Sequence, residues 1–268
     1  MALASVVARA LGWLAGLLAA GWIARLLVRR LGRWAGDRGL PGPPSGRLLA
    51  VLGGVIVLAN LPLVAYSLRP VASTAVEIAG VFRDDFNRPE LGDAYWSSGD
   101  YWRIFDGQLL SPGAHNNPLW LRAVLPPDVQ VDFDARSEAP EGDTKCEIFG
   151  NGYDHASGYI LIFGGWGNTF TTIARLDEHG VPVNAELPEP IPNGGHVRVQ
   201  RTDLHVEQGH TYHWTVIRKG GTLSWKLDGQ LVLQLIDPEP LRGPGHDRFA
   251  FSTWDADVFY DNLVITPL

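Results

Sequence analysis

The stretch VQVDFDAR, residues 129–136, decides the class of fold. Val129, Val131 and Phe133 alternate with polar residues, and this period of two is typical of a strand with one buried and one solvated face. The stretch TLSWKLDGQLVLQLI, residues 222–236, predicts a hairpin that turns at Asp228-Gly229, because glycine accepts the positive φ of a type I′ turn. The C-terminal part of the chain is therefore predicted to consist of antiparallel strands.

Further strands are expected from Val81 to the C-terminus, where helical periodicity is absent. The clearest lie at residues 101–105, 119–124, 158–165, 170–176, 196–201, 212–218, 247–253 and 258–265. Gly, Pro, Asn and Asp separate them. Many short strands with such turns predict an all-β sandwich or barrel, and about 190 residues suit two large antiparallel sheets.

Cys146 is the only cysteine, so no disulfide can form within the chain. It falls in a predicted strand and is expected to be a small buried hydrophobe. The β-rich part must therefore be stabilised by its core. This is feasible because a domain of this size buries roughly 70 per cent of the surface of its unfolded chain.

A different kind of segment precedes the strands: LLAVLGGVIVLANLPLVAYSL, residues 48–68, holds 21 residues without a charge. At about 1.5 Å per residue, a helix of this length matches a bilayer core of about 30 Å. We predict a transmembrane helix over residues 48–69. Residues 70–80 then form a short tether to the β-rich domain.

A second apolar segment, residues 1–28, contains Arg9 and Arg25 with 15 uncharged residues between them. It is predicted to form a first transmembrane helix if both arginines extend to the headgroups, with Trp13 and Trp22 as interfacial or packing aromatics. Two alternatives are a cleaved signal peptide and a helix that lies in the interface. Arginines follow the apolar segment where a signal peptide would have its cleavage site, which argues against cleavage. The arginines also do not gather on one side of the helix, which argues against a helix that lies in the interface.

The arginines between the two apolar segments predict the orientation. They stand at residues 25, 29, 30, 33, 38 and 47, against one acid, Asp37. By the positive-inside rule, the loop at residues 29–47 is cytoplasmic. Whether one or two helices cross the membrane, residues 81–268 are then expected on the periplasmic or extracellular side of the cell's inner membrane.

Charge separates the two parts of the chain. Residues 1–78 carry a net charge of +6, whereas residues 79–268 carry −13 and the whole chain has only three lysines. Nucleic-acid binding needs clustered Lys and Arg to neutralise phosphates, so the composition argues against a nucleic-acid partner. The expected partners are the lipid bilayer and other proteins or glycans.

Five stretches resemble a known superfamily when they are taken in order: DDFNRPELGDAYW (84–96), YWRIFDGQLL (101–110), GYILIFGGWGNT (158–169), GTLSWKLDGQLV (221–232) and FYDNLVI (259–265). Together they resemble the concanavalin A-like lectin and glucanase superfamily, particularly its bacterial laminin-G-like and keto-glycoside-hydrolase-like members. The resemblance covers roughly residues 81–268. It implies a jelly-roll sandwich with one concave face, here preceded by one or two transmembrane helices.

The resemblance also implies where an enzyme would carry its carboxylates. Glucanases of this superfamily place Glu-x-Asp-x-Glu, or a near variant, on one strand that faces the cleft, and that motif is absent. The nearest set is Asp132, Asp134 and Arg136 on one strand, with Glu147 expected on a neighbouring strand. This set reads as a solvated, salt-bridged face, so we predict no catalytic residues and keep a glycoside hydrolase-like enzyme as an alternative.

Metal and cofactor sites are not expected. Asp84, Asp85 and Asp261 are weak calcium candidates, since the first and last strands of the superfamily often lie close together, but Asp at strand ends more often caps turns. His210 and His213 stand three apart, on opposite faces of a strand, and cannot share a zinc ion. The glycines of FGGWGN lack the Lys-Ser/Thr of a phosphate loop.

A glycan or a partner protein has candidate contacts around residues 158–165. Sugars stack on aromatic rings while Asp, Asn and loop backbone bind their hydroxyls. The residues that flank this strand are Asn151, Tyr153, Asp154, His155, Trp166 and Asn168, with Trp96, Trp102 and Trp120 available elsewhere. The alternative is that most tryptophans fill the core of the sandwich. Trp166, between glycines, is the best candidate for exposure.

Small residues in the apolar segments suggest close helix packing. They are Gly12, Gly16 and Ala20 in the first segment and Gly53 and Gly54 in the second. The sequence as a whole favours a non-catalytic accessory or scaffolding subunit that docks on a larger membrane-protein complex, photosynthetic or respiratory. A membrane-tethered carbohydrate-binding module is the first alternative and a glycoside hydrolase-like enzyme the second.

Overall fold

The computed structural model describes residues 76–99 and 101–268, together with residues 21, 22, 25, 26, 28–30, 33, 34, 36–39, 53, 54, 58 and 61. The chain divides into two compact units, Met1–Ser73 and Thr74–Leu268.

In the N-terminal unit, the described residues from 21 to 36 are helical and a turn follows at 37–39. Gly53, Gly54, Leu58 and Leu61 are helical as well. Most of the two predicted transmembrane segments, including Gly12, Gly16 and Ala20, lies outside the described residues. Among the residues that are described, no helix has both the length and the apolar character needed to cross a bilayer.

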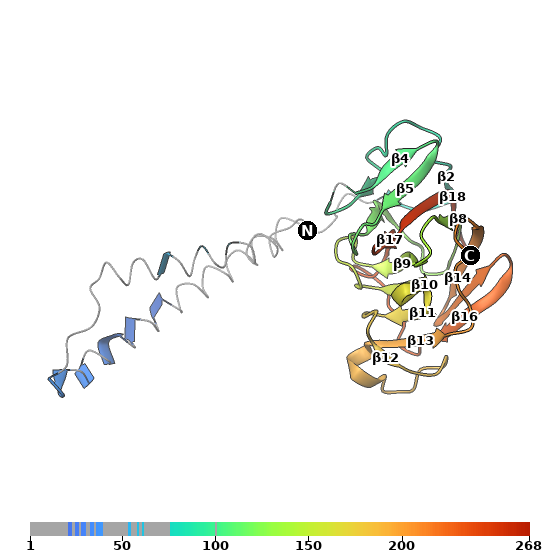
Figure 1. Ribbon diagram of the computed structural model, residues 1–268. Coiled ribbons are helices and arrows are strands. Elements are labelled where there is room, and N and C mark those ends of the chain that lie inside the picture. Colours follow the sequence, from blue (N-terminus) through green and yellow to red (C-terminus); the bar gives the residue numbers. More distant parts are fainter. Residues whose placement is uncertain are drawn as a thin grey trace. The chain divides into compact units, whose positions relative to one another are not determined.

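The C-terminal unit is an all-β sandwich, as predicted (Figure 1). Its elements are β1 (Val76–Glu77), β2 (Phe82–Asp84), β3 (Tyr95–Trp96), β4 (Arg103–Phe105), β5 (Gln108–Pro112), β6 (Leu119–Leu121), β7 (Ala123–Val124), β8 (Val129–Ser137), β9 (Thr144–Gly150), β10 (Tyr159–Gly164), α3 (Gly165–Asn168), β11 (Phe170–Arg175), β12 (Val181–Pro182), η1 (Pro192–Gly195), β13 (Val197–Arg201), β14 (Thr211–Lys219), β15 (Thr222–Leu227), β16 (Gln230–Ile236), β17 (Arg248–Thr253) and β18 (Asp257–Pro267).

Two large sheets form the layers. The first has the strand order β12-β13-β11-β10-β9-β17-β6-β3, and Figure 1 shows β9, β10, β11 and β13 as neighbours within it. The second has the order β16-β15-β14-β8-β18-β5-β4, with β2 paired to β18. Apart from the parallel pair β12 and β13, the strand pairs within both sheets are antiparallel. A short parallel pair, β1 and β7, stands apart.

Strand β8 has the alternation that its sequence predicts. Val129, Val131 and Phe133 are fully buried, and the polar residues between them are partly exposed. Phe133 stacks on Trp214 of the same sheet at 5.1 Å between ring centroids and meets Phe251 of the opposite sheet at 5.2 Å. Inward-facing aromatic side chains from both sheets therefore make one continuous core.

The hairpin of β15 and β16 turns at Asp228-Gly229, as predicted. Both residues have positive φ, 49° and 80° respectively, which is the conformation of a type I′ turn. The prediction for Cys146 is also confirmed, since its side chain is fully buried in β9.

Strand β9 differs from β8 because every one of its residues is buried. Cys146 and Ile148 face the core between the sheets, whereas Lys145 and Glu147 belong to the other face. Two loops cover that face. One follows β9 and brings His155 to Glu147, and the other follows β11 and brings Glu178 to Lys145.

Candidate functional site

The candidate site is built on the outer face of β9. Lys145 and Glu147 occupy alternate positions of this strand, so their side chains leave the same face of the sheet. Asp143 directly precedes the strand, and its carboxylate lies next to Lys145. Lys145 lies opposite Ser252 of β17 and Ile162 of β10, which places it in the interior of the sheet rather than at an edge.

The ammonium group of Lys145 is surrounded by oxygen atoms. Nζ lies 3.1 Å from Oδ1 of Asn116, 3.2 Å from Oδ1 of Asp143 and 3.3 Å from Oε2 of Glu178. Its side chain is only 4% exposed. A buried ammonium has a large desolvation cost that only such partners can offset, so the three oxygens fix both the position and the charge of Lys145.

Glu147 and His155 extend this network under the loop after β9. Nδ1 of His155 lies 2.6 Å from Oε1 of Glu147, and the backbone N–H of Ala156 donates to Oε2 of Glu147 at 3.0 Å. Nε2 of His155 lies 3.3 Å from Oε2 of Glu178. The imidazole thus bridges two carboxylates. Burial lowers the pKa of His155, but the charge and hydrogen bond of Glu147 outweigh burial and raise it to about 9.

The two carboxylates beside Lys145 have pKa shifts of opposite direction. Burial raises the pKa of Asp143 and outweighs the lowering effects of Lys145 and of the hydrogen bond from the backbone N–H of Trp254. Burial acts in the same direction on Glu178, but the hydrogen bond from His155 and the charge of Lys145 lower its pKa to about 2. Glu178 therefore remains ionised throughout the neutral range.

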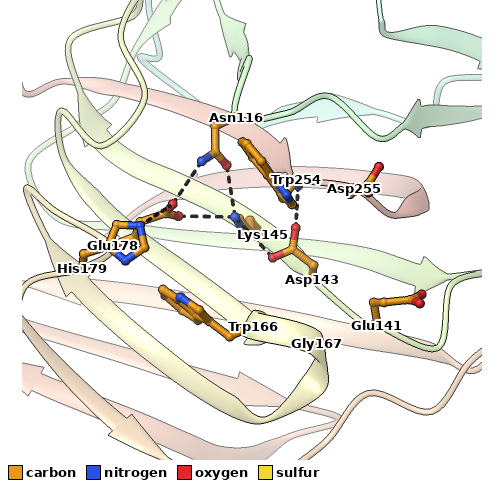
Figure 2. Close-up of a pocket in the computed structure, with 10 residues that line it drawn as sticks. All are labelled: Asn116, Glu141, Asp143, Lys145, Trp166, Gly167, Glu178, His179, Trp254 and Asp255. Atoms are coloured by element: carbon orange, nitrogen blue, oxygen red, sulfur yellow. Dashed lines mark hydrogen bonds and ion pairs between the residues drawn. The ribbon is translucent and has the colours of Figure 1, made fainter.

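A cavity of about 620 Å³ opens above this network. Figure 2 shows Lys145 in the middle of the site, with Trp254 on one side and Trp166 on the other. The two indoles are 50% and 37% exposed, respectively. The cavity is lined by Asn116, Glu141, Asp143, Lys145, Trp166, Gly167, Glu178, His179, Trp254 and Asp255.

Trp166 is held in the cavity wall by the short turn α3. Gly164, Trp166 and Gly167 have φ values of 67°, 52° and 68°, so the turn needs residues that tolerate the left-handed region. Trp166 itself is not such a residue, and its conformation is maintained by stacking on Phe170, with 4.3 Å between ring centroids. A non-glycine residue held at positive φ on the wall of a cavity is a common feature of binding sites.

The sequence-predicted ligand residues do not form one surface. Trp166 lines the cavity, and His155 lies in the network beneath it. Asn151 and Asp154 hold the loop after β9, since Asn151 Nδ2 donates to Asp154 Oδ2 at 3.0 Å. Tyr153 packs edge-on against Trp96 at 4.8 Å. The side chain of Asn168 instead fastens α3 to the backbone of Pro140 and Val206.

Two of the other tryptophans are not available to a ligand. Trp102 belongs to the core between the sheets. Trp120 is 1% exposed and packs so closely on Gly150 that a Cβ there would lie 2.3 Å from its ring. Each ring fills space within the sandwich, so the expectation that most tryptophans belong to the core is confirmed for both.

The weak calcium candidates serve as local hydrogen-bond acceptors. Asp84 accepts from the guanidinium of Arg88 and from the hydroxyl of Tyr95, and Asp85 accepts from the backbone N–H of Asn87. Asp261 accepts from Gln108 at 3.1 Å. Within the described part of the chain, no group of three or more His, Cys, Asp or Glu side chains is arranged to hold a metal ion.

The expected position of Glu147 beside Asp132 and Asp134 is wrong. Strand β8 pairs with β14 and β18, whereas β9 pairs with β10 and β17 in the other sheet. Asp134 is instead 2.7 Å from Nδ1 of His213, and Asp132 accepts from Thr215. Arg136 pairs with Glu138, so the predicted polar face exists but its partners differ.

The sequence-based reasoning identified Trp166 but missed other residues of the site, among them Asn116, Glu141, Asp143, Lys145, Glu178, Trp254 and Asp255. For Asp143 and Lys145 a signal was present, since DTKCE, residues 143–147, alternates charged and uncharged positions as clearly as β8 does. Asn116, Glu178 and Trp254 lie in loops after other strands, and no local pattern marks them.

Comparison with known proteins identifies the fold. Neither a protein-family model nor a curated protein matches the chain in sequence. Among solved structures, the chain is similar to a carbohydrate-binding module from Bacillus subtilis, with a TM-score of 0.50 and 14% identity over 65% of this chain and 95% of that chain.

Two further structures are similar. One is a protein of unknown function with a galectin-like fold from Bacillus subtilis, with a TM-score of 0.49 and 12% identity over 69% of this chain and 94% of that chain. The other is a β-1,3-1,4-glucanase (lichenase) derived from a mouse hindgut metagenome, with a TM-score of 0.47 and 11% identity over 70% and 100%. At 14% identity the likeness to the carbohydrate-binding module shows the fold alone, and the predicted jelly-roll sandwich is confirmed.

Proposed function

We propose that the β-sandwich is a glycan-binding module whose site is the cavity above Lys145. The observation that carries this proposal is the placement of two partly exposed tryptophans, Trp166 and Trp254, around a rigid polar floor. Sugars bind through the stacking of their apolar C–H faces on such rings and through hydrogen bonds to fixed polar groups. The fold, shared with a carbohydrate-binding module, supports the proposal without deciding it.

The floor of the cavity suits binding better than catalysis. Both oxygens of Asp143 and both oxygens of Glu178 already have partners within the protein. A glycosidase needs one carboxyl group that can donate its proton to the leaving oxygen and a second that acts as base or nucleophile. Lys145 holds these two carboxylates together instead, and we infer that they shape the site.

We further propose that the N-terminal apolar segments anchor this module in a membrane, with the sandwich on the outer side. The 21 uncharged residues at 48–68 and the arginines at 29–47 support the proposal. Protease added to spheroplasts is expected to degrade residues 81–268 and to spare the arginine-rich segment. The opposite pattern would reverse the orientation. The role of an accessory subunit on a larger membrane-protein complex is a second candidate function, supported by the absence of a complete catalytic motif from the sequence.

A glycan array tests the proposed function. The full-length chain in mild detergent should bind a defined subset of glycans, and Trp166→Ala and Trp254→Ala should each weaken that binding about tenfold, since loss of one stacked ring costs roughly 1 to 1.5 kcal/mol. Phe105→Ala is the matched control, because Phe105 is an exposed aromatic on β4 that does not line the cavity. Undiminished binding by both tryptophan variants would refute the site.

A further inference from the structure

The charges around the cavity are unbalanced. Four carboxylates line it, from Glu141, Asp143, Glu178 and Asp255, against a single ammonium, that of Lys145. A cavity with this excess of negative charge repels an acidic ligand and attracts a cationic one.

Lys145 is not free to receive an anion. Its three N–H groups face Asn116, Asp143 and Glu178 at 3.1 to 3.3 Å, and its side chain is nearly inaccessible. A carboxylate or sulfate on a ligand would have to displace a protein carboxylate from Lys145. The ammonium therefore neutralises the floor of the cavity and leaves the rim to the ligand.

The rim carries two carboxylates that the protein does not neutralise. Glu141 and Asp255 are exposed and lie on the same side of the cavity as Asp143, as Figure 2 shows. Within the described residues, neither carboxylate has an ion-pair or hydrogen-bond partner, whereas Asp143 and Glu178 have several. Charged acceptors on the rim of an aromatic-walled cavity are well placed for a ligand that brings its own cation.

The wall formed by Trp254, which is 50% exposed, favours the same kind of ligand, whereas the ring of Trp166 already has the guanidinium of Arg198 5.5 Å from its centroid. Indole is the side chain that attracts a cation most strongly through its ring face, and desolvation strengthens the attraction. A sugar ring that carries a protonated amine combines both requirements: its C–H face stacks on Trp166 or Trp254, and its ammonium reaches the carboxylates of the rim.

We propose that the cavity selects glycans with free amino groups, that is, oligosaccharides of glucosamine type, over their N-acetylated and acidic counterparts. This inference rests on the proposed function and adds the chemical class of the ligand. It names Glu141 and Asp255 as the residues that set the specificity.

The experiment is calorimetric titration of the full-length chain in mild detergent with three tetrasaccharides: glucosamine, N-acetylglucosamine and galacturonate. At pH 6 and low salt the glucosamine tetramer should bind at least about tenfold more tightly than the N-acetylated one, and the galacturonate tetramer should bind most weakly. Raising the ionic strength to about 0.5 M should reduce the preference, since exposed charges are screened.

Two variants test whether Glu141 and Asp255 cause the preference for the glucosamine tetramer. Glu141→Gln and Asp255→Asn should each weaken binding of the glucosamine tetramer about fivefold and leave the N-acetylated tetramer unaffected. Glu90→Gln removes an exposed acid that does not line the cavity and should change neither affinity. A lysine tetrapeptide distinguishes a sugar site from a general cation site, and it should bind much more weakly than the glucosamine tetramer.

The outcomes separate the two proposals. Equal or tighter binding of the N-acetylated or acidic tetramer refutes the selection for amines and leaves glycan binding standing. Binding of the lysine peptide as tight as that of the amino sugar refutes the assignment to sugars with amines. Absence of binding to any tetramer and to the glycan array refutes both proposals.

Discussion

Strands β8 and β9 both carry charged side chains at alternate positions, but the structure uses them differently. On β8, Asp132 and Asp134 belong to an outer face that reaches solvent, and Asp134 remains 28% exposed. On β9, Lys145 and Glu147 are buried, and Glu147 is fully inaccessible. The difference comes from the loops that cover β9 and supply Asn116, His155 and Glu178. In this chain, the strand with alternating charged residues contributes to a candidate site only where loops from other parts of the chain cover its outer face.

The largest expected effect is the loss of Lys145. Lys145→Met leaves the carboxylate of Asp143 buried without a cation and leaves Glu178 with His155 as its only ionic partner, which should lower the free energy of unfolding by about 3 to 5 kcal/mol. The matched change on β8, Arg136→Met, removes a partly exposed pair with Glu138 and should cost about 1 kcal/mol or less. Denaturant unfolding of the full-length chain measures both.

A companion variant keeps this prediction testable if Lys145→Met does not fold. Lys145→Met combined with Glu178→Gln removes one of the two carboxylate charges and should recover part of the loss. Equal stability of Lys145→Met and Arg136→Met would show that the two strands do not differ as described.

The second effect is a dependence of stability on pH that belongs to β9. Because the pKa of His155 is raised to about 9 in the folded state, its contribution is fully present below its unfolded value near 6.5 and is lost as the pH rises through 9. The free energy of unfolding should therefore fall by about 3 kcal/mol between pH 6 and pH 9.5. His155→Gln should flatten this slope.

At acidic pH the sign reverses. The pKa of Glu178 is lowered to about 2, so its contribution is present above its ordinary value and is lost as the pH falls through 2. His155 and Glu178 contact each other, and their contributions cannot be added. A stability profile that is flat between pH 6 and pH 9.5 would contradict the ion pair of His155 with Glu147.

A smaller effect is expected from the loop that covers β9. Oδ1 of Asn151 accepts hydrogen bonds from the backbone N–H groups of Tyr153 and Asp154, both at 2.8 Å. Asn151→Ala should cost about 1 to 2 kcal/mol and increase amide hydrogen exchange in residues 151–157. Exchange that increases equally throughout β8 would mean that the loop does not open by itself.

The smallest effect is expected on β8. Asp134→Asn alters the 2.7 Å contact with Nδ1 of His213, whose side chain is half exposed, and should change stability by less than about 1 kcal/mol. The change should shrink further at high salt, because exposed charges are screened. A loss of stability comparable to that of Lys145→Met would show that the charged residues on the outer face of β8 are as important for stability as those of β9.

The sequence predicts the strands well because their period is local. Residues 129–136 are β8 almost to the residue, and the turn at Asp228-Gly229 is placed correctly, since each depends only on alternation and on glycine. The pairing of strands is not local. Glu147 was expected beside Asp132, but β8 pairs with residues 211–218, far along the chain, and only the folded sheets reveal this.

The candidate site is less predictable than the strands, because its residues come together through contacts between distant parts of the chain. Trp166 was identified because flanking glycines predict an exposed turn. Trp254 and Glu178 lie in turns with ordinary polar neighbours, and their value comes only from their position next to Lys145. Asn168 shows the opposite error, since a polar residue beside a candidate site is used entirely for backbone hydrogen bonds.

The single thiol of the chain lies directly beneath the candidate site. Cys146 stands between Lys145 and Glu147 in β9, faces the core and is fully buried. A thiol-specific reagent can reach it only when β9 separates from its neighbours, so the rate of alkylation reports the opening of this strand. Bound ligand should slow alkylation in proportion to the fraction of cavities that are occupied. The rate of alkylation of the wild-type chain therefore reports ligand binding without an introduced cysteine.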